Sequence, residues 1–443
     1  MYPHTSVRDV AQLVSVRVWG ACGRQFESGH PDISLGAVTA VNTGCSDDVM
    51  ITDDDILLMQ DAMLLAQQGE GQVNPNPLVG ALIVLHDEVV ASGYHTRYGD
   101  LHAEREAFKD ADAKGIDCKG ATMYVTLEPC CHYGHQPPCT DAIKEHGIAR
   151  VVVGLLDPNP LVAGNGMRLL TEAGIDVETL EGDGFASISV EKAAKNLVSE
   201  MKMQNRVFRK YISTGMPWVT AKWAMTLDGK IATTTGDSKW ITSEAARERV
   251  HLVRKNNMAI LCGIGTVMAD DPMLNVRLTP EMMQRLGVKE HELRQPIRIV
   301  ADRQARIPME SQLVSTAREI PLVVVYGNAA DEEKLRELRE AGVTLWNCNT
   351  LTELIQRAGA EKIDSIMLES GGTLSEALLK EGLVDEVMAF VAPKLIGGKG
   401  AKTPVEGDGV EMMADAIELI NTIVETIGPD VLVSGIVKKC SQE

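Results

Sequence analysis

The stretch VGALIVLHDEVVASGYH occupies residues 79–95, and HAEREAFKDADA (102–113) and ATMYVTLEP (121–129) follow it. The first stretch predicts two strands joined by a turn at His86 and Asp87, the second a helix and the third another strand. Further on, TDAIKEHG (140–147) predicts a helix that ends at Gly147, and ARVVVGLLDP (149–158) predicts a strand. Strands that alternate with helices of about 10–15 residues indicate an α/β fold with a covered, mostly parallel sheet.

Predicted helices and strands also lie before and after residues 79–158. Acidic residues open a predicted helix over 53–68, and one long amphipathic helix is expected over 186–214. A second α/β unit begins at WVTAKWAM (218–225). The expected organisation is a disordered extension (1–49), a first α/β domain (50–199), a linker helix (200–216) and a second α/β domain (217–443).

Composition excludes several classes of function. The chain has 443 residues, and 43 basic against 62 acidic residues give a net charge of −19. Such a field opposes binding to nucleic acid and to anionic membranes, and 4% aromatic residues offer few stacking platforms for single strands. No apolar run reaches the ~18 residues that span a bilayer. Nine Cys, an odd number, do not suggest a secreted disulfide framework, so we expect a reducing, cytoplasmic location.

One cluster of residues predicts a zinc site. His102 and Glu104 open a predicted helix, and Cys130 and Cys139 follow a predicted strand. One His and two Cys leave the fourth position of Zn²⁺ open for water, as in catalytic zinc sites. Glu104 lies two residues from His102, where its carboxylate can move protons without binding the metal. The alternative is a structural zinc whose fourth ligand comes from Cys131, His132 or His135.

His-x-Glu followed by Pro-Cys…Cys is the arrangement of nucleobase-type zinc deaminases, and the spacing between the two Cys indicates which kind of substrate such an enzyme accepts. Deaminases of nucleic acids and nucleosides mostly carry Cys-x₂-Cys, whereas eight residues separate Cys130 from Cys139 here. We expect this longer loop to cover the pocket and to alter what can enter it.

The second half lacks the G-x-G-x-x-G pattern of Rossmann dinucleotide sites. Two short glycine-containing stretches, 263–266 and 369–373, follow predicted strands and could bring backbone N–H groups to a phosphate. Residues 222–277 hold eight basic and six acidic residues, a local charge of +2. An anionic substrate could therefore bind in this segment in spite of the charge of the whole chain.

Taken together, these segments resemble the bifunctional deaminase–reductase of riboflavin biosynthesis. In the first half the matching motifs are NPNPLVG (74–80), GYHTRYGDLHAE (93–104), YVTLEPCCHYGHQPPC (124–139) and DPNPLVAGNG (157–166). In the second half they are AKWAMTLDGKIAT (221–233), TGDSKWITS (235–243), GIGTVMADDPMLNVR (263–277), LRQPIRIVAD (293–302), LESGGTLSEALL (368–379) and APKLIGG (392–398). The resemblance covers roughly residues 53–440.

The resemblance implies a cytidine-deaminase-like three-layer domain followed by a dihydrofolate-reductase-like domain. The first domain would deaminate 2,5-diamino-6-(5-phosphoribosylamino)pyrimidin-4-one with zinc. The second would reduce the ribosyl side chain of the product to ribityl with NADPH. The implied partners are phosphorylated pyrimidine ribotides, with neither nucleic acid nor membrane, and the chain is expected to form a homo-oligomer.

Residue by residue, the deaminase motifs assign one His and two Cys to zinc (His102, Cys130 and Cys139), Glu104 to proton transfer, and three residues to the substrate (Asn76, His95 and His132). The loop departs from the family pattern because Cys131, His135 and Gln136 replace a serine, a basic residue and a threonine. A titratable imidazole at His135 leads us to expect weaker phosphate binding above pH ~7.

The reductase motifs assign substrate contacts to Ser238, Arg254, Leu274, Arg277 and Glu369. They assign NADPH contacts to Ala224, Trp240, Thr266, Asp270, Arg303, and the run Gly371, Gly372, Thr373, Leu374, Ser375, Glu376 and Ala377. Hydride transfer to C1 of the ring-opened imine needs a nearby proton donor or cation, for which Lys222 is the first candidate and Asp228 the second.

Two other functions fit part of these observations. A nucleic-acid deaminase with an accessory domain would keep the zinc residues, but it needs a basic, aromatic surface and is disfavoured by the net charge of −19. Alternatively, one half could be inactive and serve only for binding or dimerisation. The complete zinc set argues against an inactive first half, whereas no single residue is diagnostic in the second.

Overall fold

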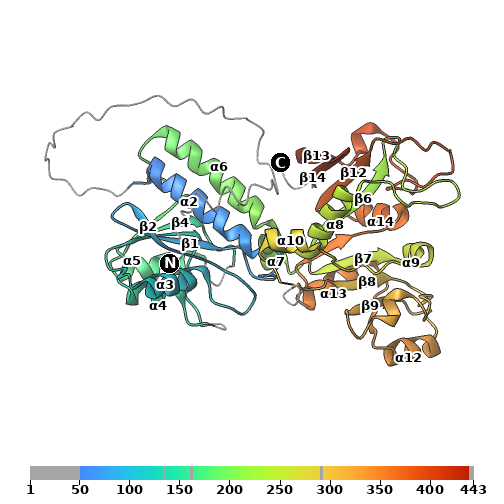
Figure 1. The fold of residues 1–443 in the computed structure, drawn as a ribbon, viewed down its shortest axis with the longest axis horizontal. Coiled ribbons are helices and arrows are strands. Elements are labelled where there is room, and N and C mark those ends of the chain that lie inside the picture. The colour runs from blue at the N-terminus through green and yellow to red at the C-terminus, as the bar shows by residue number, and fades with distance from the viewer. Residues whose placement is uncertain (1–49, 134–135, 160–162, 290–292, 439–443) are drawn as a thin grey trace. The chain divides into compact units, whose positions relative to one another are not determined.

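The computed structural model describes residues 50–133, 136–159, 163–289 and 293–438, which form two compact units (Figure 1). The first unit contains residues 50–69 and 78–205, and the second contains residues 70–77 and 206–438. The extension expected over 1–49 lies outside the described residues.

The first unit is built on a five-stranded sheet in the order β2-β1-β3-β4-β5. Its strands are β1 (Gly80–Leu85), β2 (Glu88–Tyr94), β3 (Thr122–Leu127), β4 (Arg150–Leu155) and β5 (Asp176–Thr179). Its helices are α2 (Asp53–Ala66), the 3₁₀ turn η1 (Gln67–Gly69), α3 (Ala103–Lys114), α4 (Cys139–Glu145), α5 (Asn165–Glu172) and α6 (Ile188–Gln204).

This first sheet is mixed, which corrects the expectation of a mostly parallel one. β1 pairs antiparallel with both β2 and β3, whereas β3–β4 and β4–β5 are parallel. The reason is the hairpin turn at His86 and Asp87, whose φ angles of 52° and 63° suit a two-residue connection. A connection this short reverses the chain, so β2 has to run antiparallel to β1.

The sheet lies between two helical layers (Figure 1). Apolar residues of α3, α4 and α5 pack with Ile83, Val125 and Val153 in one core cluster. On the other layer α2 and α6 bury residues such as Met59 and Met201. α2 begins at a capping box, because the side chain of Thr52 accepts the Asp55 N–H and Asp55 accepts from the Thr52 backbone. The result is a three-layer α/β/α unit.

The second unit contains a nine-stranded sheet in the order β10-β9-β8-β7-β11-β6-β12-β14-β13. Its strands are β6 (Trp218–Thr226), β7 (Ala259–Gly263), β8 (Ile297–Ala301), β9 (Leu322–Tyr326), β10 (Thr344–Asn347), β11 (Ser365–Leu368), β12 (Glu386–Ala392), β13 (Leu419–Ile427) and β14 (Asp430–Val437). Every pairing from β10 to β12 is parallel, and β14 and β13 add antiparallel at one edge.

Helices cover both faces of this second sheet. They are α7 (Arg206–Thr214), α8 (Glu244–Asn256), α9 (Ile264–Asp270), α10 (Pro280–Leu286), α11 (Gln312–Ser315), α12 (Glu332–Glu340), α13 (Leu351–Ala360), α14 (Gly372–Lys380) and the 3₁₀ turn η3 (Met413–Asp415). One core cluster joins α8, α11 and α12 to the sheet, and a second joins α13 and α14 to its other face. The parallel strands are therefore buried on both sides, as their near-continuous apolar runs require.

The long helix expected over 186–214 is two helices, because Asn205 lies between α6 and α7. The Asn205 side chain accepts the Leu78 N–H at 2.8 Å and donates to the Leu78 carbonyl at 2.9 Å. These bonds tie Asn205 to the backbone beside β1, and α6 ends there. α6 belongs to the first unit and α7 to the second, so residues 200–216 do not form a single helix. The segment 70–77 groups with the second unit, which the sequence pattern did not indicate.

No described helix has both the length and the apolar character needed to cross a membrane.

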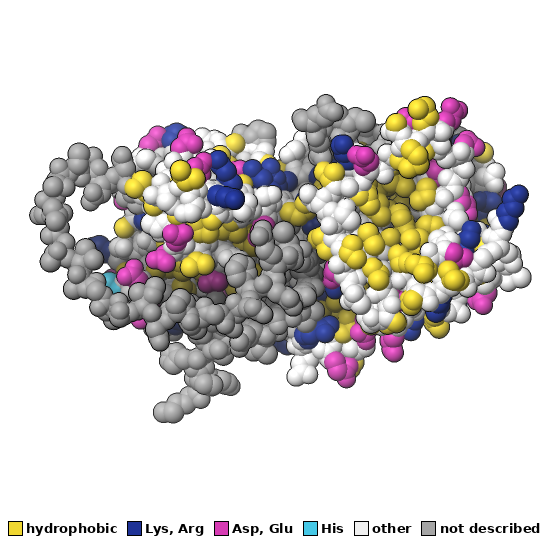
Figure 2. Space-filling model, turned by 90° about the horizontal axis from the view of Figure 1, so that it is seen from above, with side chains coloured by type: hydrophobic (Ala, Val, Ile, Leu, Met, Phe, Trp, Pro, Cys, Tyr) yellow, Lys and Arg dark blue, Asp and Glu magenta, His cyan; other side chains and the backbone are white. Residues whose placement is uncertain are grey.

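The face of the second unit shown in Figure 2 carries a broad group of apolar side chains among mixed charges. In that unit, large exposed apolar residues are concentrated between Leu395 and Val424.

Candidate active sites

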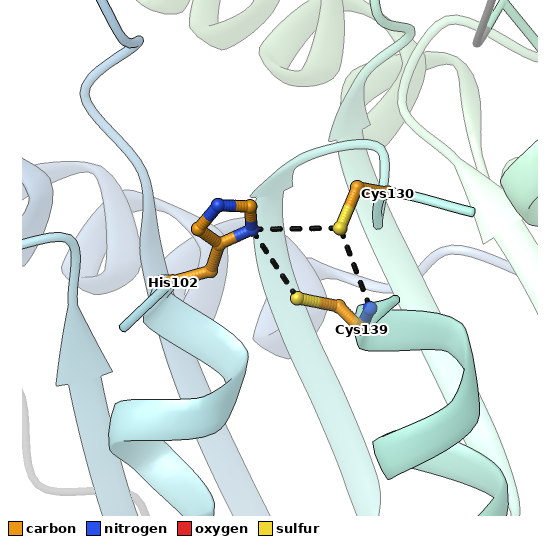
Figure 3. Close-up of side chains that lie close together, drawn as sticks. All are labelled: His102, Cys130 and Cys139. Carbon is orange, nitrogen blue, oxygen red and sulfur yellow. Dashed lines mark hydrogen bonds between the residues drawn. The ribbon is translucent and has the colours of Figure 1, made fainter. Parts of the chain in front are cut away.

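Three side chains of the first unit converge on one point. His102 precedes α3 as its N-cap residue, Cys130 follows β3, and Cys139 is the first residue of α4. Nδ1 of His102 lies 3.4 Å from Sγ of Cys130 and 3.5 Å from Sγ of Cys139 (Figure 3). Among the described residues these three form a possible metal-binding group, with ligand atoms within 4.8 Å of one another.

These distances fit zinc. With Zn–S near 2.3 Å and Zn–N near 2.0–2.1 Å, the N-to-S edge of a tetrahedral site is about 3.6 Å. The two observed distances, 3.4 and 3.5 Å, are close to that edge. Cys131 and His132 do not join the group, and His135 lies outside the described residues. Three protein donors and a fourth open position are the arrangement of a catalytic zinc.

The local electrostatics suit metal binding and proton transfer. The hydrogen bond with Cys139 and contact with His102 hold the pKa of the Cys130 thiol at about 4, against the effect of burial. Glu104, in the first turn of α3, is 3% exposed. Burial and the charge of Cys130 raise the pKa of Glu104 to about 7 from the protein groups alone. A carboxyl group poised near neutrality can both accept and donate a proton.

Two neighbouring residues that the motifs did not single out support this site. The buried Glu128 carboxylate accepts four backbone N–H groups: Gly166 (2.9 Å) and Met167 (3.3 Å) at Oε1, and Gly164 (2.9 Å) and Asp157 (3.3 Å) at Oε2. It thereby joins the end of β3, two residues before Cys130, to the start of α5. Its partners are 29 to 39 residues away, so no local pattern could have revealed them.

The second of these residues is Arg105, which follows Glu104 on α3. Its guanidinium donates to the carbonyls of Pro137 at 3.2 Å and Pro138 at 2.8 Å. These bonds hold the end of the long loop directly before Cys139.

The three residues predicted to contact the substrate of the deaminase lie in different settings. His95 is buried, its Nδ1 is 2.9 Å from the Leu101 carbonyl, and its ring lies 5.6 Å from that of His102. Burial lowers the pKa of His95, which favours the neutral ring. His132 is exposed in the loop after Cys130. Asn76 lies in the segment 70–77, which groups with the second unit.

In the second unit, Lys222, Arg254 and Glu369 form an ionic cluster. Glu369 follows β11, and its carboxylate accepts from Lys222 of β6 at 3.2 Å and from Arg254 of α8 at 2.7 and 3.0 Å. Burial alone would raise the pKa of Glu369, but the two cations lower it to about 2. The cluster therefore contains two cations and one firmly ionised carboxylate.

Two of the other predicted substrate residues, Leu274 and Arg277, lie close together in the chain after α9. Arg254 also donates to the Asn275 carbonyl at 2.9 Å, and Arg277 donates to the Asn275 side chain at 2.8 Å. Leu274 is buried with a φ of 47°, a left-handed conformation that is unusual for Leu. Ser238 is half-buried in the loop between β6 and α8.

Most of the predicted cofactor residues lie just beyond the carboxyl ends of parallel strands. Thr266 and Asp270 are on α9 after β7, Arg303 follows β8, and residues 371–377 open α14 after β11. Because β8, β7 and β11 are parallel neighbours, these positions share one edge of the sheet, where α/β folds bind ligands. A Cβ atom at Gly265 or Gly371 would meet nothing within 4 Å, so the backbone there is open to a ligand.

The remaining positions and the second catalytic candidate lie around β6. Ala224 is on the strand itself. Trp240 is 64% exposed, with the guanidinium of Arg247 4.5 Å from its ring centroid. Asp228 accepts from the Thr226 hydroxyl and from the backbone N–H groups of Ile396 and Gly397. These bonds give Asp228 a role in holding the loop after β12, which leaves Lys222 as the stronger candidate for chemistry.

Comparisons with known proteins match both units. Residues 52–155 match the family described as the cytidine and deoxycytidylate deaminase zinc-binding region, and residues 217–433 match the RibD C-terminal domain. The riboflavin biosynthesis protein RibD of Actinobacillus pleuropneumoniae is 43% identical over 389 residues, covering 86% of this chain and 95% of its own. That of Escherichia coli is 41% identical over 384 residues, covering 85% and 98%.

Solved structures agree with these matches. A RibD structure from Acinetobacter baumannii has a TM-score of 0.73 at 35% identity, covering 87% of this chain and 99% of its own. A Thermotoga maritima protein described as a diaminohydroxyphosphoribosylaminopyrimidine deaminase/5-amino-6-(5-phosphoribosylamino)uracil reductase has a TM-score of 0.71 at 32% identity, with the same two coverages.

Fold and site together define a bifunctional enzyme with a zinc-dependent deaminase unit and a reductase unit. The first unit has the cytidine-deaminase-like fold and the second the dihydrofolate-reductase-like fold, as the resemblance implied. The chain belongs to the RibD family of riboflavin biosynthesis enzymes. The matches also indicate zinc in the first unit and a cofactor of the nicotinamide class in the second.

Proposed function

We propose that the first unit converts 2,5-diamino-6-(5-phosphoribosylamino)pyrimidin-4-one to 5-amino-6-(5-phosphoribosylamino)uracil with release of ammonia. The observation that carries this proposal is the triangle of His102, Cys130 and Cys139 with the buried Glu104 beside it. The description of the Thermotoga maritima protein supports the same substrate.

The chain's own residues hold the reactants and move the protons. His102, Cys130 and Cys139 hold zinc, which when bound supplies a water activated for attack at neutral pH. Glu104 takes a proton from the attacking water and delivers it to the departing amine. Asn76 can donate and accept hydrogen bonds at the pyrimidine edge, and His95 and His132 contact the substrate.

The second unit, we propose, reduces the ribosyl side chain of the uracil product with NADPH. When bound, NADPH would supply the hydride that C1 of the ring-opened imine accepts, and the imine nitrogen would take up a proton. Lys222 supplies the nearby cation and is the first candidate for that proton. Ser238, Arg254, Leu274, Arg277 and Glu369 hold the substrate, and the clustering of Lys222, Arg254 and Glu369 supports this role.

NADPH is expected to lie along the edge formed by Thr266, Asp270, Arg303 and residues 371–377, with Ala224 and Trp240 completing its site. The open backbone at Gly265 and Gly371 supports phosphate binding at these helix starts. The cytoplasmic location and the homo-oligomer stay predictions.

Separate assays of the two half-reactions test this proposal. Purified protein is incubated with the diaminopyrimidinone ribotide, with and without NADPH, while ammonia release and NADPH consumption are followed independently. The Glu104→Ala variant should release ammonia at least about 100-fold more slowly, because it lacks the proton carrier. It should still consume NADPH with supplied uracil ribotide at the wild-type rate. Absence of both activities in the wild type would refute the assignment.

A further inference from the structure

The segment 275–277 of the second unit is held by side chains rather than by strand pairing. Arg254 of α8 donates to the Asn275 carbonyl at 2.9 Å. Gln295 accepts the Val276 N–H at 2.8 Å and donates to the Val276 carbonyl at 3.0 Å. His251 of α8 accepts the Arg277 N–H at Nδ1, at 3.2 Å. Three side chains thus fix consecutive backbone groups of a segment that carries no regular structure.

The chain needs such support here because its backbone is strained. Leu274, with φ of 47°, and Asp271, with φ of 41°, both adopt left-handed conformations. For a non-glycine residue this conformation is unfavourable and persists only where surrounding contacts enforce it. Leu274 is 3% exposed and packs in the larger core cluster, which holds one side of the segment. The bonds from His251 and Gln295 hold the residues that follow.

The charges around His251 keep it able to accept a hydrogen bond. Arg254 and Arg277 lower the pKa of the ring, whereas the Glu369 carboxylate and a backbone hydrogen bond with Asn275 raise it. Burial and the two cations lower the pKa of His251 to about 4. The ring is therefore neutral near pH 7, and Nδ1 offers its lone pair to the Arg277 N–H.

We propose that His251 is a positioning residue of the reductase, which holds the Leu274–Arg277 segment in its substrate-binding conformation by accepting the Arg277 N–H. It lies three residues before Arg254 on α8, so one helix face supplies both a predicted substrate residue and the support for another. The inference rests on the proposed substrate roles of Leu274 and Arg277. His251 itself touches backbone, not the reacting atoms.

Two variants distinguish the contribution of the hydrogen bond to Arg277 from the contribution of the size of the His251 ring. His251→Phe keeps a ring of similar size but removes the acceptor, whereas His251→Asn keeps an acceptor oxygen close to the position of Nδ1. In the Phe variant the KM for the uracil ribotide should rise about 5- to 30-fold, as expected for loss of one such bond. The value of kcat should fall by less, and the KM for NADPH should not change. The Asn variant should restore the ribotide KM to within about 3-fold of wild type.

The circular dichroism spectrum and the KM for NADPH report whether the second unit is correctly folded in each variant, and the deaminase activity of the first unit reports how much protein was recovered. An unchanged ribotide KM in the Phe variant overturns the proposal, as does an Asn variant that is equally impaired. If the Phe variant fails to fold, His251→Leu takes its place, because it also removes the acceptor of the Arg277 N–H. A wild-type ribotide KM in that variant would then overturn the proposal. Failure of the proposed reductase function is a different result: wild-type protein that consumes no NADPH with the ribotide.

Discussion

Glu128→Gln should weaken the zinc site although Glu128 is not a metal ligand. Each Glu128 oxygen accepts two backbone N–H groups, Gly166 and Met167 at one and Gly164 and Asp157 at the other. A glutamine side chain has one carbonyl oxygen and one NH₂ group. In either orientation, two backbone donors then face another donor instead of an acceptor.

The size of the effect follows from those two lost bonds. A buried donor left without a partner costs about 1–3 kcal/mol, so two of them cost about 2–6 kcal/mol. For a unit of this size, each kcal/mol lowers the Tm by about 2–4 °C, and we expect the first unit to melt roughly 10 °C lower. Because Cys130 lies two residues beyond Glu128, loosening the end of β3 should also speed the loss of zinc to a chelator.

Three measurements on the Glu128→Gln protein test these predicted effects on stability and zinc release. They are thermal unfolding, the rate of zinc transfer to a chromogenic chelator, and ammonia release. Glu172→Gln on α5 is the matched control, because Glu172 is 58% exposed and forms a surface ion pair with Arg168. Breaking that surface pair should cost less than about 1 kcal/mol and leave zinc release unchanged. NADPH consumption serves as the internal control in both variants.

A Glu128→Gln protein that melts at the wild-type temperature and releases zinc at the wild-type rate would contradict this prediction. A lower Tm with unchanged zinc release would show that Glu128 stabilises α5 without influencing Cys130.

Two further predictions concern the reductase unit. The folded-state pKa of Glu369, about 2, lies below its ordinary value of 4.5, so its contribution to stability is complete above pH 4.5 and is lost as pH falls toward 2. In denaturant titrations, the free energy of unfolding of the wild type should fall by about 3 kcal/mol over that pH range because of Glu369. The Glu369→Gln variant should lack this decrease. If the free energy of unfolding depended on pH equally in both proteins, the ionic cluster would be contradicted. We expect the exposed guanidinium of Arg303 to contact the 2′-phosphate of NADPH, so Arg303→Ala should lose much of the preference for NADPH over NADH. The preference is measured as the ratio of kcat/KM for NADPH to kcat/KM for NADH. An unchanged ratio would exclude that contact.

The deaminase residues could be predicted because their chemistry is encoded in short segments. His102 and Glu104 begin a helix whose apolar spacing is visible in the sequence, and Cys130 follows a strand that is equally clear. Donor types and spacing alone indicated zinc, and the structure adds the distances. The support from Glu128 and Arg105 could not be predicted, since neither belongs to a donor pattern and their partners come from distant loops.

The reductase residues were harder to identify from the sequence for the same reason. Lys222 and Glu369 are 147 residues apart, and Arg254 and Glu369 are 115 apart. Nothing local distinguishes Lys222 from a surface lysine, and His251 looks like one of several polar residues on α8. Only the resemblance to a known family pointed to Arg254 and Glu369. It did not indicate His251 or Gln295, because their partners are backbone groups.

The sequence indicated two α/β units and the zinc donor set, because apolar periodicity and metal-ligand chemistry are properties of short segments, and the resemblance of its motifs indicated the family. Only the packed structure shows where helix α6 ends, that residues 70–77 group with the second unit, and that β1 also pairs antiparallel with β3. It also decided that Glu369 lies between two cations and that three side chains hold residues 275–277. Each of these features depends on groups that are far apart in the chain and meet only when the sheets and helices pack.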